Sequence, residues 1–510
     1  MAFSKIIFNG TTLMDVTQDT VAADNLLAGE TATGADGQQV TGAYVPSGGG
    51  VQEVESGVIF VDYDGTLIDA WEAADVAGKT ALPNNPSHTD IGLTSQGWNW
   101  ALADIKSYIS DYPTAVLTIG QLYTTTSGAS ELDCTFDSNT LAPYLGIAVN
   151  GTAVIDWGDN SATSTLTGTS LTTLKWANHT YSAAGNYTIS ITPQSGSYVF
   201  YYSGSAGGVL ARSSSFTSDR TYRGCINAVR VGANANLANL SFNGLLNAKY
   251  ITLPSTVTTI GSETFSSCYG IRALTIPTNV TSLGDWCVNG SQSLNYISLP
   301  KGLTSIGQQC FSESAVRFLA FPTGITSIAA SVCNQCATLR NLTLSNNITS
   351  VGQYSFRYTR ALRTVHLSTK LATISSSAFY SANVAQFGPL PSSVTSIGGS
   401  AFYYNYSSRT MIINEGVTSI PSSCFYQNYS LSFVELPSTL TSIAAQAFYG
   451  DFSLAKIRFN RSTPPTVANS NAWSSVPTSC VISVPVGSLS SYTSASNYPS
   501  SSTYTYIEEA

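Results

Sequence analysis

Apolar residues recur at a fixed spacing through the second half of the chain. An aliphatic residue returns every 23 positions, with one step of 22, and most of these residues close a triplet such as Thr441-Ser442-Ile443. The recurring positions are Ile260, Leu283, Ile306, Ile328, Val351, Ile374, Ile397, Ile420 and Ile443. A fixed period of this length indicates stacked supersecondary units, because one unit cannot bury its apolar face alone.

Two further apolar lanes keep the same period. Aromatic residues follow the recurring aliphatic by five positions, at Phe265, Phe311, Phe356, Phe379, Phe402, Phe425 and Phe448. Other aliphatic residues precede it by nine positions, at Leu274, Ile297, Leu319, Leu342, Val365, Met411 and Val434. The pattern predicts two short strands per repeat, with the apolar lanes inside and Thr and Ser outside. Because neighbouring strands lie ~4.8 Å apart, nine repeats would form a stack roughly 43 Å long.

The register of these lanes resembles the BspA-like leucine-rich repeats of bacterial surface proteins. Segments such as Leu294 to Cys310 and Leu431 to Phe448 carry the Leu-Pro, Thr-Ser-Ile and aromatic positions together. We assign residues 237–459 to this solenoid and residues 460–510 to a C-terminal cap, and we expect the solenoid to fold independently of the N-terminal half. Gly388-Pro389 and the early Ile328 are expected to disturb the stack locally.

The first residues of the chain read as brief strands separated by glycine turns. Residues 1–46 contain closely spaced glycines, and residues 47–57 form a Gly-rich linker. The segment resembles short glycine-punctuated modules near the N-termini of phage tail and other virion structural proteins. The resemblance implies an attachment module through which the chain would bind other virion proteins.

Residues 58–126 are predicted to form a small α+β module. Val58 to Val61 reads as a strand, and Gly97 to Tyr112 reads as a helix that Thr94 or Ser95 could cap. The segment Asp62-Tyr63-Asp64-Gly65-Thr66 resembles the nucleophile motif of haloacid-dehalogenase-type phosphatases. In that family Asp62 would attack phosphorus and Asp64 would act as acid and base. That family also needs a downstream Lys and a paired-aspartate magnesium site within a doubly wound domain. Only about 60 residues follow before a β-rich segment, and they show no alternation of strands and helices. An Asp-Gly turn in a structural module is therefore the favoured interpretation.

Residues 127–197 resemble the PKD domain, an immunoglobulin-like β-sandwich. The resemblance rests on Trp157-Gly158-Asp159, His179-Thr180-Tyr181 and Gly185-Asn186-Tyr187. It implies that Trp157 fills the core, that Tyr181 and Tyr187 brace a strand pair and that His179 is structural. Residues 198–236 are interpreted as a join and an N-terminal cap. The predicted fold is therefore mainly β and multidomain, with a PKD-like sandwich followed by a leucine-rich-repeat solenoid.

Composition narrows the functional classes. Charged residues make up only 10% of the chain, the net charge is −8, and no run of Lys and Arg appears, which argues against nucleic-acid binding. No apolar stretch approaches the ~18 residues of a membrane helix, and no secretory leader is evident at the N-terminus. The nine cysteines mostly keep the repeat phase and are expected to pack as small buried residues. Cys333-x-x-Cys336 could suggest redox or zinc chemistry, but no second pair completes it.

A second aromatic pattern marks the last repeats and gives the candidate binding site. Tyrosines directly follow the core phenylalanines, and another aromatic lane runs three residues further on. The residues are Tyr380, Tyr403, Tyr426 and Tyr449, with Tyr406, Tyr429 and Phe452. Stacked exposed tyrosines offer flat amphipathic area for sugar rings or protein loops. The alternative is that the position simply tolerates a tyrosine that packs on neighbouring turns.

These patterns predict a non-enzymatic binding protein without metal or cofactor. We expect a phage virion protein, of the tail-fibre or receptor-binding type, that binds a glycan or protein on a bacterial surface. A bacterial cell-surface adhesin is the alternative, and a phosphatase acting through Asp62 is a weaker one. We further expect a homo-oligomer, with a trimer as the working hypothesis.

Overall fold

The computed structural model describes residues 51–200, 209–214, 220–239, 241–385 and 387–509, with four short strands before residue 51. The chain divides into two compact units, Met1–Glu53 and Val54–Ala510. In the first unit β1 (Lys5–Phe8) pairs with β2 (Thr11–Asp15), and β3 (Thr31–Thr33) pairs with β4 (Gln39–Thr41), both antiparallel. Brief paired strands agree with the prediction for this segment. The glycines of the predicted linker, residues 48–50, lie outside the described residues.

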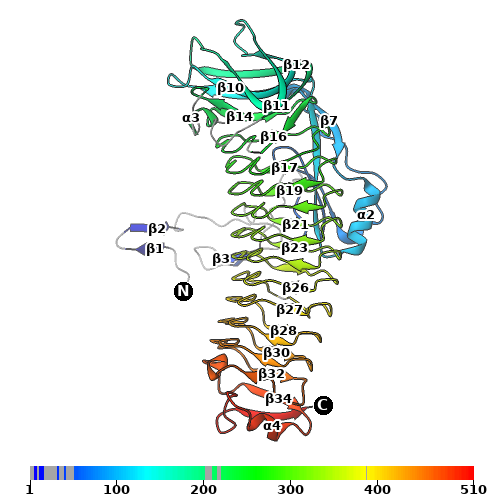
Figure 1. Ribbon diagram of the computed structural model, residues 1–510, viewed down its shortest axis with the longest axis vertical. Helices are drawn as coiled ribbons and strands as arrows, with labels where there is room; N and C mark the ends of the chain where they lie inside the picture. Colours follow the sequence, from blue (N-terminus) through cyan, green and yellow to red (C-terminus); the bar gives the residue numbers. More distant parts are fainter. Residues whose placement is uncertain are drawn as a thin grey trace. The chain divides into compact units, whose positions relative to one another are not determined.

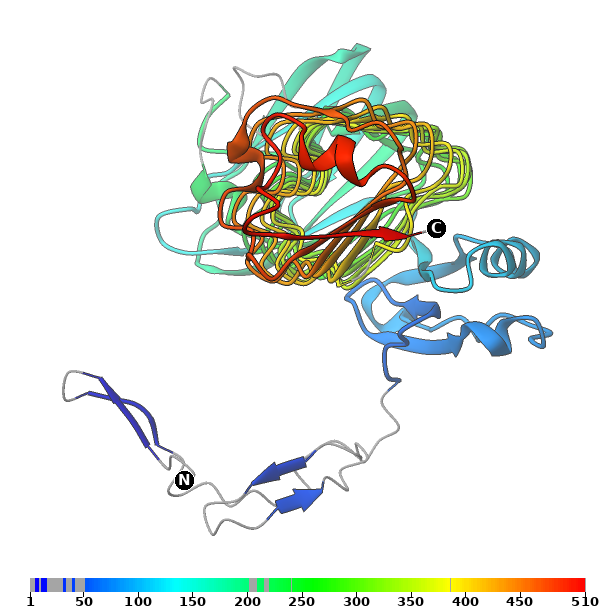
Figure 2. The same cartoon turned by 90° about the horizontal axis from the view of Figure 1, so that it is seen from below.

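The repeats form a β-solenoid whose rungs pair in parallel, as the period predicts (Figure 1). One lane of strands comprises β17 (Ala273–Thr275), β19 (Tyr296–Ser298), β21 (Phe318–Ala320), β23 (Asn341–Thr343), β25 (Thr364–His366), β28 (Thr410–Ile412), β30 (Phe433–Leu436) and β32 (Lys456–Phe459). The other lane of strands contains the recurring Thr-Ser-Ile triplets. Its members are β18 (Ser282–Leu283), β20 (Ser305–Ile306), β22 (Ser327–Ile328), β24 (Ser350–Val351), β26 (Thr373–Ile374), β27 (Ser396–Ile397), β29 (Ser419–Ile420), β31 (Ser442–Ile443) and β33 (Thr466–Val467). Seen along the stack, successive rungs superimpose (Figure 2). The mainly β fold with a C-terminal solenoid is confirmed.

The lanes are in register from rung to rung. Leu274 lies opposite Ile297 in one lane, and Ile420 lies opposite Ile443 in the other. The core phenylalanines stack inside, with centroid distances of 5.3 Å, 5.9 Å, 5.6 Å and 5.4 Å along Phe356, Phe379, Phe402, Phe425 and Phe448. In both lanes strand pairing is interrupted between the rungs of Ile306 and Ile328 and resumes after it. At Gly388-Pro389 the first lane is reduced to one bridge, between Pro389 and Ile412. The expected local disturbances are therefore present.

Each rung also contains a tight loop in which two residues have positive φ. In one rung these residues are Ser377 and Ser381, both at φ 55°. Every second backbone N–H group of the loop points toward the next rung. Ser377, Phe379 and Ser381 donate to the carbonyls of Gly399, Ala401 and Tyr403 at 3.0 Å, 2.9 Å and 2.7 Å. The loops therefore form a third hydrogen-bonded face of the solenoid, although they are not strands.

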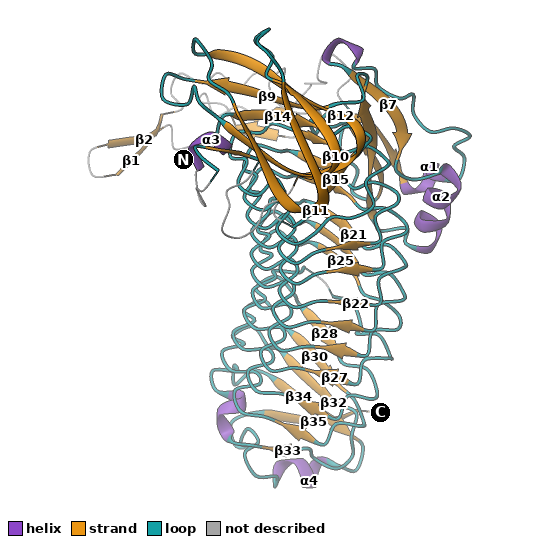
Figure 3. Ribbon diagram, turned by 45° about the horizontal axis from the view of Figure 1, so that its top comes forward, coloured by secondary structure: helices purple, strands orange, loops and turns teal. Residues whose placement is uncertain are grey.

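The sheet-rich segment before the solenoid joins it without a break. Six strands follow the order β11-β10-β12-β9-β14-β16, with β13 (Leu210–Ala211) and β15 (Ala235–Leu237) paired to β10 and β12. Their bounds are β9 (Ser130–Phe136), β10 (Tyr144–Asp156), β11 (Ser164–Asn178), β12 (Gly185–Phe200), β14 (Ile226–Arg230) and β16 (Ile251–Thr252). The segment is consistent with the predicted sandwich (Figure 3). However, β12 and β14 cross the predicted boundaries, and β14 pairs in parallel with β16 of the first rung.

This continuity argues against the expectation that the solenoid folds independently of the N-terminal half, which stays a prediction. One hydrophobic core runs from Leu132 through Phe242 to Tyr492. The physical reason is that the first rung would otherwise expose an unpaired strand edge, and β14 covers it.

The residues that carry the PKD resemblance lie as expected. Trp157 is buried, and its Nε1 donates to Ser164 Oγ at 2.9 Å. The hydroxyl of Tyr181 donates to the carbonyl of Trp157 at 2.8 Å. His179 stacks on Trp157 and lies 2.8 Å from Asp159 Oδ2, which is the structural role predicted for it.

Residues 57–125 form a four-stranded sheet in the order β6-β5-β8-β7. The elements are β5 (Gly57–Val61), β6 (Leu67–Glu72), α1 (Ala73–Val76), η2 (Thr89–Ile91), β7 (Leu93–Trp98), α2 (Leu102–Asp111) and β8 (Val116–Thr125). The prediction that a helix begins near Gly97 is wrong. Trp98 pairs with Gln121 as the last residue of β7, and Ala101 is the helix N-cap, so Thr94 and Ser95 lie in a strand.

This small sheet docks along the strand face of the first rungs (Figure 1). Ile59, Val61 and Val116 pack against Ala273, Tyr296 and Phe318, which occupy outward positions of the rungs. Polar contacts fix the register, because Trp100 Nε1 donates to the carbonyl of Leu299 at 2.7 Å and Tyr108 Oη donates to that of Phe321 at 3.0 Å. Residues 57–125 are thus a buttress of the solenoid rather than a detached module.

The C-terminal cap closes the other end. η3 (Ser470–Trp473) places Trp473 on Phe448 at a centroid distance of 5.3 Å, which ends the phenylalanine stack. β34 (Val481–Pro485) and β35 (Thr505–Glu509) extend the strand lane, and α4 (Leu489–Thr493) buries Tyr492. None of the helices in the described part of the chain has the length and apolar character that crossing a membrane requires.

Candidate binding surface

The predicted aromatic residues gather in two neighbouring lanes on the loop face of the last rungs. Each tyrosine of the first lane directly follows a buried phenylalanine, so it points outward. The rings of Tyr380, Tyr403, Tyr426 and Tyr449 are nearly parallel, with centroid distances of 4.6 Å, 4.5 Å and 4.8 Å. These distances match the rung spacing expected from the sequence.

The two lanes differ in exposure. The first lane is half-buried, because each ring covers the next. The expectation that these tyrosines are simply exposed is therefore wrong. In the second lane Tyr406, Tyr429 and Phe452 are 37%, 40% and 55% exposed and lie 5.0 Å and 5.5 Å apart. The second lane is the accessible part of the surface, and the first lane is its packed support.

Two arginines extend the lanes toward the preceding rungs, and sequence reasoning missed them. Arg357 precedes Tyr380 by one period, and its Cζ lies 4.4 Å from the ring centroid of Tyr358 and 5.5 Å from that of Tyr380. Arg360 precedes Tyr406 by two periods and lies 5.3 Å from the centroid of Tyr358. The signal was available in the repeat register, since both arginines occupy the aromatic lanes. One end of the surface is therefore cationic.

Four tyrosines of this surface stay uncharged near neutral pH. Burial raises the pKa of Tyr380, Tyr403, Tyr406 and Tyr426 above the ordinary tyrosine value, and neighbouring tyrosines raise it further. Their hydroxyls therefore remain able to donate and to accept hydrogen bonds. A flat aromatic platform edged with neutral hydroxyls suits sugar rings and protein loops.

The aspartates of the phosphatase-like motif occupy a turn between β5 and β6. The backbone N–H of Gly65 donates to the carbonyl of Asp62 at 3.1 Å, and that of Thr66 donates to Asp64 Oδ1 at 2.9 Å, which confirms the Asp-Gly turn. The carboxylate of Asp62 is buried. Tyr123 Oη donates to its Oδ1 at 2.6 Å, and His88 Nε2 lies 2.6 Å from its Oδ2. With both oxygens engaged, Asp62 holds the turn in place and is poorly placed to attack a phosphate ester.

The cysteines show the predicted packing. All nine are buried free thiols. Cys336 Sγ donates to the carbonyl of Phe311 at 2.8 Å, and burial raises the pKa of Cys333 well above its ordinary value. Among the described residues, no group of three or more His, Cys, Asp or Glu side chains could hold a metal ion.

Comparison with protein families agrees with the repeat register. The model of the BspA type leucine rich repeat region matches residues 235–363 and 349–475. The solenoid is therefore a BspA-type leucine-rich repeat region. Such regions are typical of bacterial surface proteins and of non-enzymatic binding scaffolds.

Solved structures with leucine-rich repeats resemble parts of the chain. A leucine-rich repeat protein from Bacteroides ovatus is 18% identical over 59% of this chain and 90% of its own, with a TM-score of 0.41. The leucine rich repeat protein of T. pallidum is 23% identical over 28% of this chain and 72% of its own, with a TM-score of 0.26. A leucine rich cell surface protein from Faecalibacterium prausnitzii is 17% identical over 53% and 87%, with a TM-score of 0.26. Among curated proteins no match was found.

Proposed function

We propose that the protein is a non-enzymatic adhesin that binds a glycan or protein of a bacterial surface through the aromatic lanes of its last rungs. The observation that carries this proposal is the pairing of an exposed lane, Tyr406, Tyr429 and Phe452, with the stacked lane beneath it. Aromatic anchors held rigidly on regular structure lose little side-chain entropy on binding, so they contribute strongly to interface energy.

The setting of this adhesin is a further part of the proposal. We place it in a phage virion, as a tail-fibre or receptor-binding protein. The support is the resemblance of residues 1–46 to virion attachment modules, which would bind other virion proteins. The alternative is display on a bacterial cell surface. Immunogold labelling of purified virions and of cells separates the two settings.

Residues 127–197 are proposed to be a PKD-like domain. The support is the Trp157-Gly158-Asp159 turn with Tyr181 bound to the Trp157 carbonyl. In this chain its strands continue into the cap of the solenoid, so the domain would fix the orientation of the repeats rather than act as a flexible spacer.

The test removes the exposed lane. The triple variant Tyr406→Ser, Tyr429→Ser and Phe452→Ser should weaken attachment to cells that bind the wild type at least about tenfold, which is ~1.4 kcal/mol. The melting temperature should change little, because these side chains are 37%, 40% and 55% exposed. Attachment is measured by flow cytometry of labelled protein on a panel of bacterial strains.

A matched control is available at the other end of the stack. Tyr269 occupies the same repeat position and is 41% exposed, but it lies in the first rungs, away from the aromatic lanes. Tyr269→Ser should leave attachment unchanged. Full attachment of the triple variant, or an equal loss in Tyr269→Ser, would place the receptor site elsewhere.

A further inference from the structure

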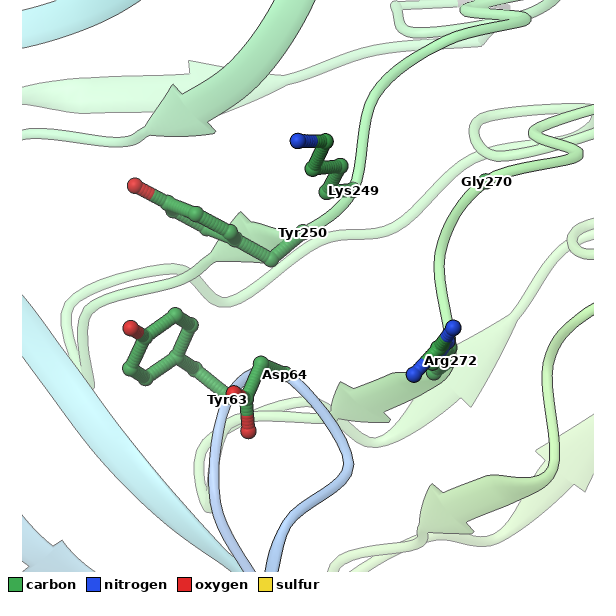
Figure 4. Close-up of a pocket in the computed structure, with 6 residues that line it drawn as sticks. All are labelled: Tyr63, Asp64, Lys249, Tyr250, Gly270 and Arg272. Atoms are coloured by element: carbon green, nitrogen blue, oxygen red, sulfur yellow. The ribbon is translucent and has the colours of Figure 1, made fainter.

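A pocket of about 430 Å³ lies where the β5–β6 turn meets the first two rungs (Figure 4). Tyr63, Asp64, Lys249, Tyr250, Gly270 and Arg272 line it. Its volume is in the range of small-molecule sites in proteins. The pocket lies far along the stack from the aromatic lanes and shares no residue with them.

Two cations form one wall of this pocket. Lys249 and Arg272 are 23 positions apart, so they occupy equivalent positions on adjacent rungs, and both side chains are exposed. Backbone hydrogen bonds tie each residue to its outer neighbour in the stack, since the N–H of Lys249 donates to the carbonyl of Asn227 at 2.7 Å and the carbonyl of Arg272 accepts from Asn295 at 2.9 Å. Like charges on adjacent rungs repel, so an anion bound beside both would relieve that repulsion.

Two aromatic rings also line the pocket, and Tyr250 directly follows Lys249 in the chain (Figure 4). Tyr63 and Tyr250 meet at a centroid distance of 4.6 Å and an interplanar angle of 73°. Arg230 Nη1 donates to Tyr250 Oη at 3.0 Å, while the same guanidinium is held by Asp133 and Glu131. Burial and the nearby Asp64 raise the pKa of Tyr63 to about 12, so its hydroxyl stays neutral. These rings offer a fixed apolar face beside neutral hydroxyls.

The third feature is the carboxylate of Asp64, which also lines the pocket. Asp64 is exposed, and its Oδ1 accepts the N–H of Thr66. The carboxylate of Asp64 repels every anion, a sugar carboxylate included, but it accepts hydrogen bonds from the hydroxyl groups that a sugar ring supplies. The Asp62 contacts to Tyr123 and His88 hold the turn that presents Tyr63 and Asp64. The phosphatase-like motif thus serves to shape the pocket.

We propose that this pocket binds a uronic acid, that is, a sugar ring bearing a carboxylate. The carboxylate would lie between Lys249 and Arg272, the apolar side of the ring against Tyr63 and Tyr250, and a hydroxyl would donate to Asp64. This combination of two cations, an aromatic wall and one acceptor distinguishes an acidic sugar from a neutral sugar and from a simple anion. The site is independent of the proposed adhesion through the aromatic lanes.

In the experiment the full chain is titrated separately with glucuronate, glucose and inorganic phosphate. Binding is measured by isothermal titration calorimetry or ligand-detected NMR. Glucuronate should bind at least about tenfold more tightly than either of the other two ligands. Lys249→Gln and Arg272→Gln should each weaken glucuronate binding at least about tenfold, with the melting temperature unchanged. The matched control is Arg363→Gln, an exposed arginine at the same repeat position but beside a rung without the turn. Its affinity should equal that of the wild type.

Several outcomes would overturn the proposal. They are no glucuronate binding by the wild type, an equal loss in Arg363→Gln, or phosphate binding as tight as glucuronate. Tyr63→Ala supplies a further test, because it removes one of the two aromatic rings but keeps both cations. Glucuronate affinity retained in a folded Tyr63→Ala protein would show a plain anion site and refute the sugar assignment.

Discussion

A lane of buried Ser, Thr, Cys, Asn and Asp side chains runs through the interior of the loop face, eight residues after the recurring aliphatic, with Ala382 as the exception. In most rungs this residue bonds a carbonyl, as Ser291 Oγ does with Phe265 at 2.9 Å. In the last rungs the residues are Asn405, Asn428 and Asp451. Asn428 Oδ1 accepts the N–H of Asn405 at 2.6 Å, and Asp451 Oδ1 accepts that of Asn428 at 2.8 Å. Asp451 is fully buried, and its Oδ2 has no hydrogen-bond partner among the described residues.

Asp451 should therefore make the stability of the protein depend on pH. Burial raises its pKa well above the ordinary value, so the folded state favours the neutral acid. In the unfolded chain the Asp451 carboxyl ionises near pH ~3.9. The free energy of unfolding therefore decreases as pH rises from there toward the pKa of Asp451 in the folded protein. Asp451→Asn continues the asparagine ladder without a charge, and it should raise the free energy of unfolding at pH 7 by about 1–3 kcal/mol. Urea denaturation at pH 4 and pH 7 checks this; an unchanged pH slope in the variant would contradict it.

At the scale of elements, the paired positive-φ residues are what allow the loops to stack. The same two loop positions have positive φ in rung after rung, as in Gln309 and Glu313, Tyr354 and Tyr358, or Ser400 and Tyr404. A left-handed conformation costs a non-glycine residue about 1–2 kcal/mol. The inter-rung hydrogen bonds of these loops compensate for that cost across the whole stack.

Substitution at one such position tests this balance. Ser400 has φ 56°, and its N–H donates to the carbonyl of Ser422 at 3.0 Å. Ser400→Gly should raise the free energy of unfolding by about 0.5–1 kcal/mol, and Ser400→Val should lower it by about 1–2 kcal/mol. Ser392 is an exposed serine outside the positive-φ set, so Ser392→Gly should instead destabilise slightly. Thermal melting decides between these signs, and equal effects of glycine at both sites would refute the strain argument.

The lanes of this solenoid could be predicted from sequence, but its loop conformation could not. Ile443 and Phe448 are visible because burial selects one residue type at every period. The positive-φ positions hold Glu, Gln, Ser, Trp or Tyr, and Gly only at Gly290 and Gly450, so residue type at these positions does not predict the conformation. The helix start was misplaced for a similar reason, because strand pairing of Trp98 overrode a helical apolar spacing.

At the scale of the whole Val54–Ala510 unit, contacts distant in sequence join the parts. Asn341 Nδ2 donates to the carbonyl of Thr114 at 2.9 Å, and the N–H of Asn346 donates to Tyr112 Oη at 2.8 Å. These contacts were not predicted, because a docking partner has no periodic signature. The available signal was the apolar character of Tyr296 and Phe318 at outward strand positions. These residues show that the first rungs carry a covered face.

Truncation should reveal this coupling. A fragment of residues 213–510 lacks β9 and β12, which pair with β14 and β15, and lacks the buttress that covers Tyr296 and Phe318. Because repeat stability depends mainly on nearest neighbours, the damage should be graded along the stack. In hydrogen–deuterium exchange, residues 242–320 should lose protection relative to a fragment of residues 54–510, while residues 410–485 should keep theirs. Equal protection of residues 242–320 in the two fragments would show that the repeats are stable alone and that the buttress does not stabilise them.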